Sequence, residues 1–232
     1  MINKLQIDDL IIDNLKNKKY SFKNKNNKFS ANGYIGNKKV KVFETFDKDQ
    51  GKLMKFLSTN KELANYFPKI IVFNNKFIVE EWVDGKTLKE LNKNLTTEIP
   101  QSDEVKHIIN LMWSVEYKEK VFDYIKYIYE KIKKKYNLNL DYLPIRVNHN
   151  DLSLDNIVET STGLKIIDNE FLGCNNGWIL NIKNSFIKED TNYHNYISKK
   201  TLDKLWEIRK EWSKVNSEKQ KWTLKNFIKK IL

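Results

Sequence analysis

The residues best suited to chemistry lie around two short segments that have the composition of strands. Segments 157–158 and 164–167 are rich in branched apolar residues and are joined by a polar turn that ends in Gly163, so an antiparallel hairpin is predicted. That pairing would set Asn156 and Asp168 side by side at the open end of the hairpin. Two oxygen-bearing side chains held in this way suit Mg²⁺, which prefers oxygen ligands and is usually shared with substrate phosphates.

Asp151 lies five residues before Asn156, on the loop that leads into the predicted hairpin. Its carboxylate could accept a hydrogen bond from a substrate hydroxyl and orient that hydroxyl for attack on a phosphorus atom. His149 is expected to brace the same loop, and we place it with Asp151 in the candidate catalytic group. The alternative is an Asn- and Asp-rich turn between two strands, without chemistry.

This pattern resembles the protein-kinase-like superfamily, in which His-x-Asp is followed by four residues and Asn, and then by a strand that ends in Asp. Segment 167–170, Ile-Asp-Asn-Glu, is similar to the branch of aminoglycoside phosphotransferases and choline kinases, whereas a protein kinase would show Asp-Phe-Gly. The resemblance implies that Asp151 is the catalytic base or hydroxyl-orienting group. It also implies that Asn156 and Asp168 are magnesium ligands and that ATP is the co-substrate.

The N-terminal half should then supply the nucleotide site. Lys41 lies between two valines and looks like the strand lysine of the superfamily that contacts the triphosphate. Lys39, on the same strand face, is the competing choice, and a solvated strand face is the alternative to both. The acid that pairs with this lysine is expected on the following helical region, at Asp49 or Glu62, and the spacing does not decide between them.

Segment 77–85 resembles the hinge strand that joins the two lobes of such proteins. The resemblance implies that the backbone of Glu81, Trp82 and Val83 hydrogen-bonds an adenine ring and that the indole of Trp82 gives apolar contact. A plain hairpin strand is the alternative. The sequence contains no Gly-x-Gly-x-x-Gly, and segment 32–36 is the candidate for a turn that covers the phosphates.

These features predict a two-lobed α+β fold of the protein-kinase-like type, with an antiparallel-sheet N-lobe and a mostly helical C-lobe. Residues 1–83 would form the nucleotide-binding lobe, and residues 84–232 the lobe for catalysis and acceptor binding. Apolar periodicity and turn residues predict the elements. They are an amphipathic helix within 1–18, two or three strands within 20–46, helical structure over 47–67, strands at 70–73 and 77–79, a short helix at 87–91, a loop at 92–103, a long helix over 104–136 and helices from 202 onward.

Composition excludes several classes of protein. The 232 residues are 40% hydrophobic, which argues against intrinsic disorder, and the single cysteine excludes an internal disulfide framework. No apolar run reaches the roughly 18 residues that span a bilayer, so we expect a cytoplasmic protein. The net charge of +12 is scattered along the chain and indicates first a solvated, compositionally basic surface; the alternative is attraction to an anionic acceptor, with peripheral contact to an anionic membrane or glycolipid.

The sequence therefore predicts an ATP- and Mg²⁺-dependent kinase that acts on a hydroxyl of a small molecule or glycan. Candidate acceptors are a sugar, a sugar of lipopolysaccharide or capsule, and an amino alcohol such as choline. A catalytically silent kinase-like scaffold is the first alternative. A basic nucleic-acid-binding protein is the second, but no nucleic-acid partner is expected because no motif of that class is present.

Overall fold

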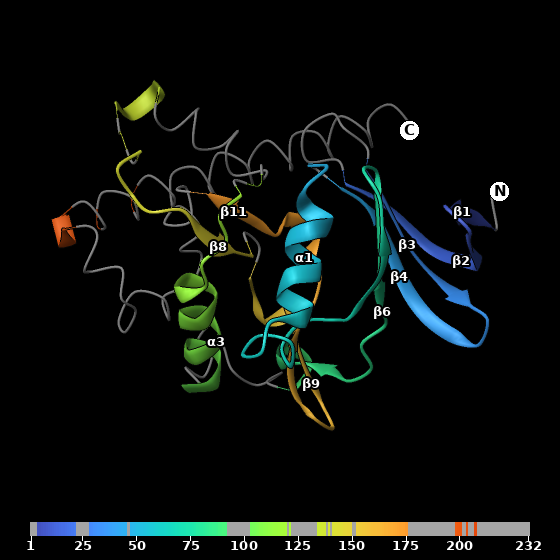
Figure 1. Ribbon diagram of the computed structural model, residues 1–232. Helices are drawn as coiled ribbons and strands as arrows, with labels where there is room; N and C mark the ends of the chain where they lie inside the picture. The colour runs from blue at the N-terminus through green and yellow to red at the C-terminus, as the bar shows by residue number, and fades with distance from the viewer. Residues whose placement is uncertain are drawn as a thin grey trace, which may run out of the picture.

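The computed structural model describes residues 4–21, 28–45, 47–91, 103–119, 121, 134–137, 139, 141–149, 152–175, 198–200, 203 and 207, without the side chains of 17–21 and 28. Figure 1 shows a curved sheet at one side of the molecule, with helix α1 packed beside it. Within this part of the chain, no helix is both long and apolar enough to cross a membrane.

The sheet is antiparallel and contains six strands in the order β1-β2-β3-β4-β6-β5. Its strands are β1 (Leu5–Ile7), β2 (Leu10–Ser21), β3 (Lys28–Ile35), β4 (Lys38–Glu44), β5 (Ile70–Phe73) and β6 (Phe77–Glu81). Helix α1 (Gln50–Thr59) connects β4 to β5, and the predicted turn at 74–76 joins β5 to β6. The strands predicted within 20–46 and at 70–73 and 77–79 are therefore confirmed. The helical structure predicted over 47–67 is confirmed in part, because α1 ends at Thr59 and turns follow it.

The predicted helix within residues 1–18 is wrong, because this segment forms β1 and the first part of β2. Ile12 is buried and its neighbour Ile11 is half exposed, as alternation along a strand requires. The register then shifts between Asp13 and Lys16, where Asn14 has a φ of 52°. This irregularity brings Leu15 back to the buried face, three residues after Ile12. The resulting spacing imitates the period of a helix.

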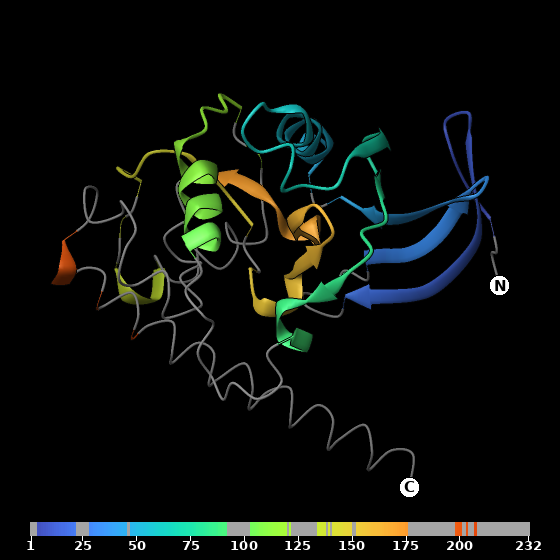
Figure 2. The same cartoon turned by 90° about the horizontal axis from the view of Figure 1, so that it is seen from below.

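The second half of the described chain builds two smaller antiparallel sheets, in the orders β10-β9-β7 and β11-β8. Their strands are β7 (Lys86–Thr87), β8 (Arg146–Asn148), β9 (Ile157–Thr160), β10 (Gly163–Ile166) and β11 (Gly173–Asn175), and the helices are α2 (Leu88–Leu91) and α3 (Asp103–Ser114). The predicted hairpin is confirmed as β9 and β10, with Ile157 opposite Ile166. In Figures 1 and 2 this yellow-to-orange hairpin lies between α3 and the blue sheet.

The long helix predicted over 104–136 is wrong as a single element. Helix α3 ends at Ser114, and Val121 forms an isolated antiparallel bridge with Cys174 of β11. Val121 is fully buried, so its side chain packs into the core from an extended segment and not from the face of a helix. Residues 122–133 lie outside the described part of the chain, as do residues 92–102 of the loop predicted at 92–103, whose last residue, Asp103, begins α3. Of the helices predicted from 202 onward, the description covers residues 203 and 207 alone.

One apolar core joins the large sheet to the later elements. Phe43 and Ile78 of the sheet belong to the same buried cluster as Ile108 of α3 and Ile166 of β10. The backbone of Tyr66 adds a direct link, since its carbonyl accepts a hydrogen bond from the Ile166 N–H at 2.7 Å. The predicted α+β class, with its antiparallel-sheet first part, is confirmed by this topology. The boundary after Val83 stays a prediction.

Gly85 allows β7 to approach β9 closely, and its replacement should destabilise the fold. Its φ is 156°, and a Cβ added there would lie 2.2 Å from the carbonyl oxygen of Glu159. We expect Gly85→Ala to lower the free energy of unfolding in urea by about 2–4 kcal/mol. Gly36→Asn is the control, because Gly36 also has a positive φ but a Cβ added to it would meet no atom within 4 Å. Its cost should stay near about 1 kcal/mol, and equal losses in both variants would contradict this account.

Candidate active site

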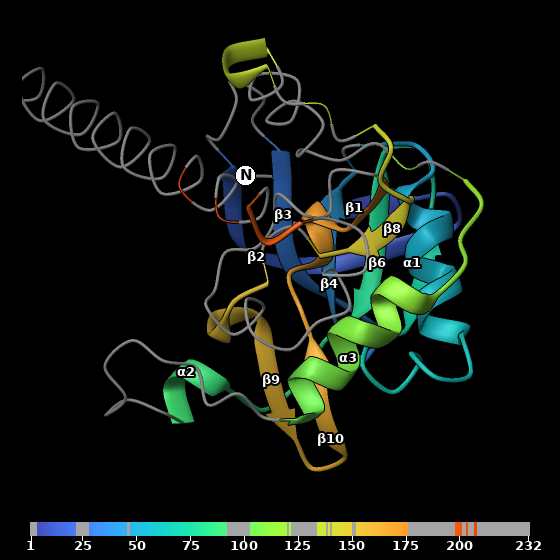
Figure 3. The ribbon, with the colours of Figure 1, turned by 90° about the vertical axis from the view of Figure 1, so that its left-hand side faces the viewer.

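Two loops lie side by side because their flanking strands are paired. The loop after β8 leads into β9, the loop after β10 leads into β11, and β8 pairs with β11 while β9 pairs with β10. The Ile167 N–H donates to the Asn156 carbonyl at 2.9 Å, which extends the hairpin by one step. Asn156 is therefore opposite the residue that precedes Asp168. Figure 3 shows β9 and β10 running next to each other beside α3.

His149 connects these two loops. Its side chain is 2% exposed, and Nε2 lies 2.9 Å from the carbonyl oxygen of Ile167. A carbonyl only accepts hydrogen bonds, so Nε2 must carry the proton and donate it. The structure thus gives His149 the bracing position expected from the sequence. Asp151, two residues further on, lies outside the described residues.

Asp168 is held in a backbone conformation that is uncommon for a residue other than glycine. Its φ is 61° and its ψ is 44°, in the left-handed region. The Asp168 side chain is 40% exposed, and Oδ1 accepts a hydrogen bond from the Lys41 Nζ at 2.6 Å. Asn156, in contrast, is buried. The hairpin therefore presents one accessible carboxylate next to one enclosed amide.

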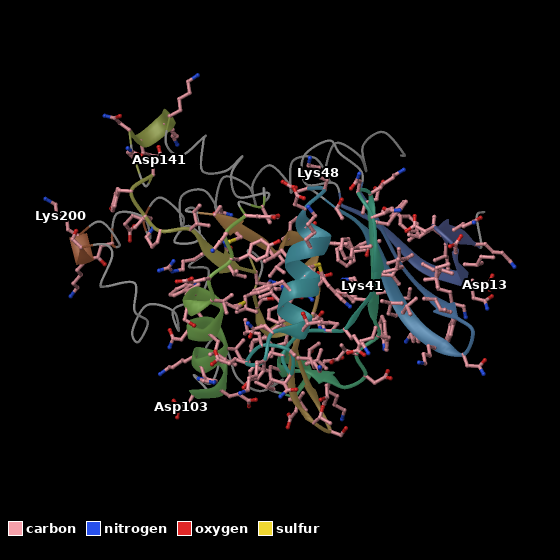
Figure 4. All side chains as sticks on the ribbon, viewed as in Figure 1. Asp13, Lys41, Lys48, Asp103, Asp141 and Lys200 are labelled. Carbon is pink, nitrogen blue, oxygen red and sulfur yellow. The ribbon has the colours of Figure 1, made fainter. Side chains whose placement is uncertain are left out.

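Lys41 points from β4 toward this carboxylate, and Lys39 does not. Figure 4 labels Lys41 in the region between α1 and the sheet. Its Nζ lies 2.6 Å from Asp168 and 4.0 Å from Glu80 Oε1. Burial alone would lower the pKa of Lys41, but the carboxylates of Glu80 and Asp168 outweigh burial and raise that pKa above its usual value. The Lys39 Nζ instead lies over the ring of Trp82, 3.6 Å from its centroid.

The acid closest to Lys41 on the sheet is Glu80, which the sequence analysis did not select. Asp49 forms an ion pair with Lys52 at 2.8 Å, and Glu62 is exposed beyond the end of α1. Glu80 stands directly opposite Lys41 in the pairing of β4 with β6, so the two side chains share one face. The expectation that Asp49 or Glu62 contacts Lys41 therefore finds no support in this geometry. The sequence signal for Glu80 is the pairing of its strand with the strand of Lys41, because the register of that pairing sets the two residues opposite each other.

Glu80 is unusual for an acid because its side chain is almost completely buried. Burial raises the pKa of Glu80 to about 7, although the charge on Lys41 and a hydrogen bond from Asn169 act in the opposite direction. The Asn169 Nδ2 donates to Glu80 Oε2 at 3.4 Å. Glu80 thus touches the loop that carries Asp168 as well as facing Lys41.

Gln50, at the start of α1, is a second residue that the sequence analysis missed. Its buried side-chain amide donates to the carbonyls of Glu170 and Leu172, both at 2.9 Å, and lies 3.4 Å from that of Asn169. Helix α1 is therefore hydrogen-bonded, through Gln50, to the backbone of the loop that follows Asp168. No local sequence pattern marks such a contact, because the partners are about 120 residues away.

Two backbone N–H groups of the predicted hinge already donate hydrogen bonds within the protein. The N–H of Glu81 donates to the Lys69 carbonyl at 2.9 Å, and that of Trp82 donates to the Lys39 carbonyl at 3.2 Å. Within the described chain, the N–H of Val83 has no such partner. The Trp82 indole N–H donates to Asp84 at 2.9 Å, which fixes the ring near Lys39.

Segment 32–36, the candidate for a turn that covers the phosphates, forms the end of β3 and the start of the turn into β4. Gly36 lies in this turn, with a φ of 55°. The neighbouring start of β4 is joined to the hinge, since the Lys39 carbonyl accepts from Trp82. Segment 32–36 is thus at the hinge end of β4. The connection between β2 and β3 occupies residues 22–27, which are outside the described chain.

Asn156 and Asp168 carry oxygen atoms of the kind that Mg²⁺ prefers, and of the two only Asp168 is accessible. Among the residues described, no group of three or more His, Cys, Asp or Glu side chains is arranged to hold a metal alone. Mg²⁺ in phosphoryl-transfer sites commonly takes only one or two carboxylates from the protein and completes its shell with phosphate and water. The accessible carboxylate of Asp168 is chemically suited to that incomplete kind of site.

Removal of the Gln50 amide should weaken the fold, because two buried loop carbonyls would lose their donor. We expect Gln50→Ala to lower the free energy of unfolding by about 2–3 kcal/mol in urea titrations. Gln6→Ala is the matched control: Gln6 also donates to a backbone carbonyl, that of Asp8, but at an exposed site. Its effect should remain within about 0.5 kcal/mol. A loss in Gln50→Ala as small as the one expected for Gln6→Ala would show that the loop does not need the Gln50 amide.

The pKa of Glu80 also predicts how stability changes with pH. Glu80 keeps its proton up to about pH 7 in the folded chain but loses it near pH 4.5 when unfolded. The folded state binds the extra proton between these values, so the free energy of unfolding falls as pH rises through this window. Lys41 adds no pH dependence in this window, because its pKa is raised above its usual value and it is protonated in both the folded and the unfolded chain. Relative to Glu80→Gln, the native chain should lose about 3 kcal/mol between pH 4 and pH 8. A difference that stays constant with pH in urea unfolding would contradict a buried, titrating Glu80.

Comparisons with known proteins find structural likeness without sequence likeness. No protein-family model and no curated protein matches the sequence. The solved structures similar to this chain include the gentamicin complex of APH(2")-IIa, with a TM-score of 0.44 and 14% identity over 72% of this chain and 70% of that one. They also include the apo form of a thermostable mutant of the aminoglycoside phosphotransferase APH(4)-Ia, with a TM-score of 0.48 and 9% identity over 84% of this chain and 76% of that one. The ADP-bound aminoglycoside phosphotransferase APH(2'')-Ib is similar with a TM-score of 0.42 and 14% identity, over 72% and 70% of the two chains.

Proposed function

We propose that this protein is a kinase that transfers a phosphoryl group from ATP, with Mg²⁺, to a hydroxyl of a small molecule or glycan. The observation that carries the proposal is the contact between Lys41 and Asp168. It unites a cation from the large sheet with an accessible carboxylate at the end of the β9–β10 hairpin, at 2.6 Å. A phosphate-binding cation beside an oxygen-rich loop is the arrangement that phosphoryl transfer uses.

Each residue has a separate task in this proposal. Lys41 offsets negative charge on the triphosphate, and Asn156 and Asp168 hold the magnesium, which when bound neutralises charge on the phosphates. Asp151 accepts the hydrogen bond of the acceptor hydroxyl and directs its oxygen toward phosphorus. His149 does not react. It maintains the spacing of the two loops through its hydrogen bond to Ile167.

The adenine would bind at the hinge that follows β6. The N–H groups of Glu81 and Trp82 already donate within the protein, so the N–H of Val83 is the donor best placed for the base. The indole of Trp82 is tied to Asp84 and covered by Lys39. It therefore offers an apolar edge in a fixed position. The preference between ATP and GTP would depend on the hydrogen bonds that the bound base makes with the hinge.

The acceptor is proposed at the level of chemical class. APH(2")-IIa has been solved in complexes with gentamicin and streptomycin, and APH(4)-Ia in a complex with hygromycin B. This chain carries a net charge of +12, which would repel a polycation and favours an anionic sugar, such as one of lipopolysaccharide or capsule. An amino alcohol such as choline is the other class to test. The cytoplasm stays the predicted location.

The proposal predicts Mg²⁺-dependent transfer that needs Asp151 and Asp168. The assay offers ATP and Mg²⁺ with a panel of sugars, glycolipids, amino alcohols and aminoglycosides. Asp151→Ala and Asp168→Ala should each lower kcat for the accepted substrate at least about a hundredfold. Asp155→Ala is the matched control, since Asp155 lies in the same loop but is exposed and paired with Lys89 at 2.8 Å. Its rate should stay within about twofold of native, as a screened surface pair permits.

The same assay separates the alternatives. ATP binding by the native chain without turnover of any acceptor would favour the silent scaffold. Failure to bind any nucleoside triphosphate would reject the kinase, and salt-sensitive binding to random oligonucleotides would then favour the basic nucleic-acid-binding protein.

A further inference from the structure

The helix after β4 cannot hold Lys41 through an acid of its own. Helix α1 has the sequence Gln-Gly-Lys-Leu-Met-Lys-Phe-Leu-Ser-Thr and contains neither Asp nor Glu. Asp49 precedes it and is paired with Lys52, and Glu62 follows it at an exposed position. In protein kinases an ion pair between the strand lysine and a glutamate of this helix must be formed for activity. This chain must position its lysine in another way.

Strand β6 supplies the missing carboxylate. Glu80 faces Lys41 directly in the register, and its Oε1 lies 4.0 Å from Nζ. Because both strands belong to one sheet, the spacing of their backbones is fixed by the ladder of hydrogen bonds and cannot change as a helix position can. Glu80 is therefore a rigid partner for Lys41.

The two carboxylates near Lys41 differ in how firmly they are enclosed. The Glu80 side chain is 2% exposed, and its Oε2 accepts a hydrogen bond from the Asn169 Nδ2 at 3.4 Å. The Asp168 side chain is 40% exposed. Asp168 can therefore turn toward an incoming ligand, whereas Glu80 has no route to solvent. When Asp168 does so, Glu80 is the acid that stays beside the Lys41 ammonium.

We propose that Glu80 is the positioning residue for Lys41, in place of an acid on the helix, and this inference rests on the proposed kinase function. Glu80 keeps the ammonium of Lys41 oriented toward the triphosphate after Asp168 has exchanged its contact with Lys41 for the nucleotide. Helix α1 has a different task, since Gln50 ties it to the backbone of the loop after Asp168. The lysine and the helix are thus positioned independently.

The test measures ATP affinity in the presence of Mg²⁺ by calorimetry at pH 8, where most of Glu80 is ionised, for the full chain and for Glu80→Gln. This variant keeps the size of the side chain and one oxygen that can accept from Asn169, but it removes the charge. We expect ATP binding to weaken about tenfold, as is usual when a residue that orients a ligand-binding side chain is changed. Glu80→Asp, which restores the charge, should recover part of the loss. Asp49→Asn and Glu62→Gln remove the charges that flank α1 and should leave affinity unchanged.

A double-mutant cycle distinguishes positioning from a general structural effect. If Glu80 acts through Lys41, Glu80→Gln should cost little further affinity once Lys41→Met is present, so the two losses should not add. Additive losses would overturn the inference, and so would an unchanged affinity in Glu80→Gln alongside a weakened one in Lys41→Met. In those cases nucleotide binding by the native chain still supports the kinase. A native chain that does not bind ATP would reject the kinase and this inference together.

Discussion

The charge on Lys41 is the constraint on which the site depends. Its ammonium is largely removed from water, and an unpaired buried cation would be costly. The fold meets this cost with carboxylates from two places that are far apart in the sequence: Glu80 on the adjacent strand and Asp168 at the end of the hairpin, 127 residues away. The pairing therefore favours only those arrangements in which the hairpin closes against the large sheet.

A second requirement is that the loop after Asp168 have a single conformation. The loop is short and its carbonyls are enclosed, so each needs a donor that local structure does not provide. His149 donates to residue 167 from one side, and Gln50 donates to residues 170 and 172 from the other. Asp168 lies between these anchors in the left-handed region. Its strained backbone is thus held by neighbours on both sides, which fixes the position of the Asp168 backbone and leaves its half-exposed side chain able to turn.

The sequence predicted what local chemistry determines and missed what distant contacts determine. The β9–β10 hairpin was predictable because branched apolar residues flank a polar turn, and the same holds for β5 and β6. The irregularity at Asn14 was not, since it shifts the apolar pattern of β2 by one residue and gives it a helical spacing. Val121, within the predicted long helix, instead forms a bridge with Cys174, a distant contact that only the folded chain reveals. The importance of Glu80 and Gln50 likewise follows from register and tertiary contact.

The balance of charge around Lys41 explains why a nucleotide should enter this site together with a cation. Glu80, Asp168 and Glu170 all raise the pKa of Lys41, so one ammonium is surrounded by three acids. With Glu80 near its pKa at neutral pH, the group still carries an excess of negative charge. A bare triphosphate would be repelled by that excess, because charges of the same sign interact strongly where water is partly excluded. In the proposed kinase, Asp168 would pair with a divalent cation carried by the triphosphate, and the ammonium of Lys41 would then be available to phosphate. The ion pair between Lys41 and Asp168, which joins the sheet to the hairpin in this structure, would be exchanged for two contacts with the metal-bound nucleotide, and neither charge would be left without a partner.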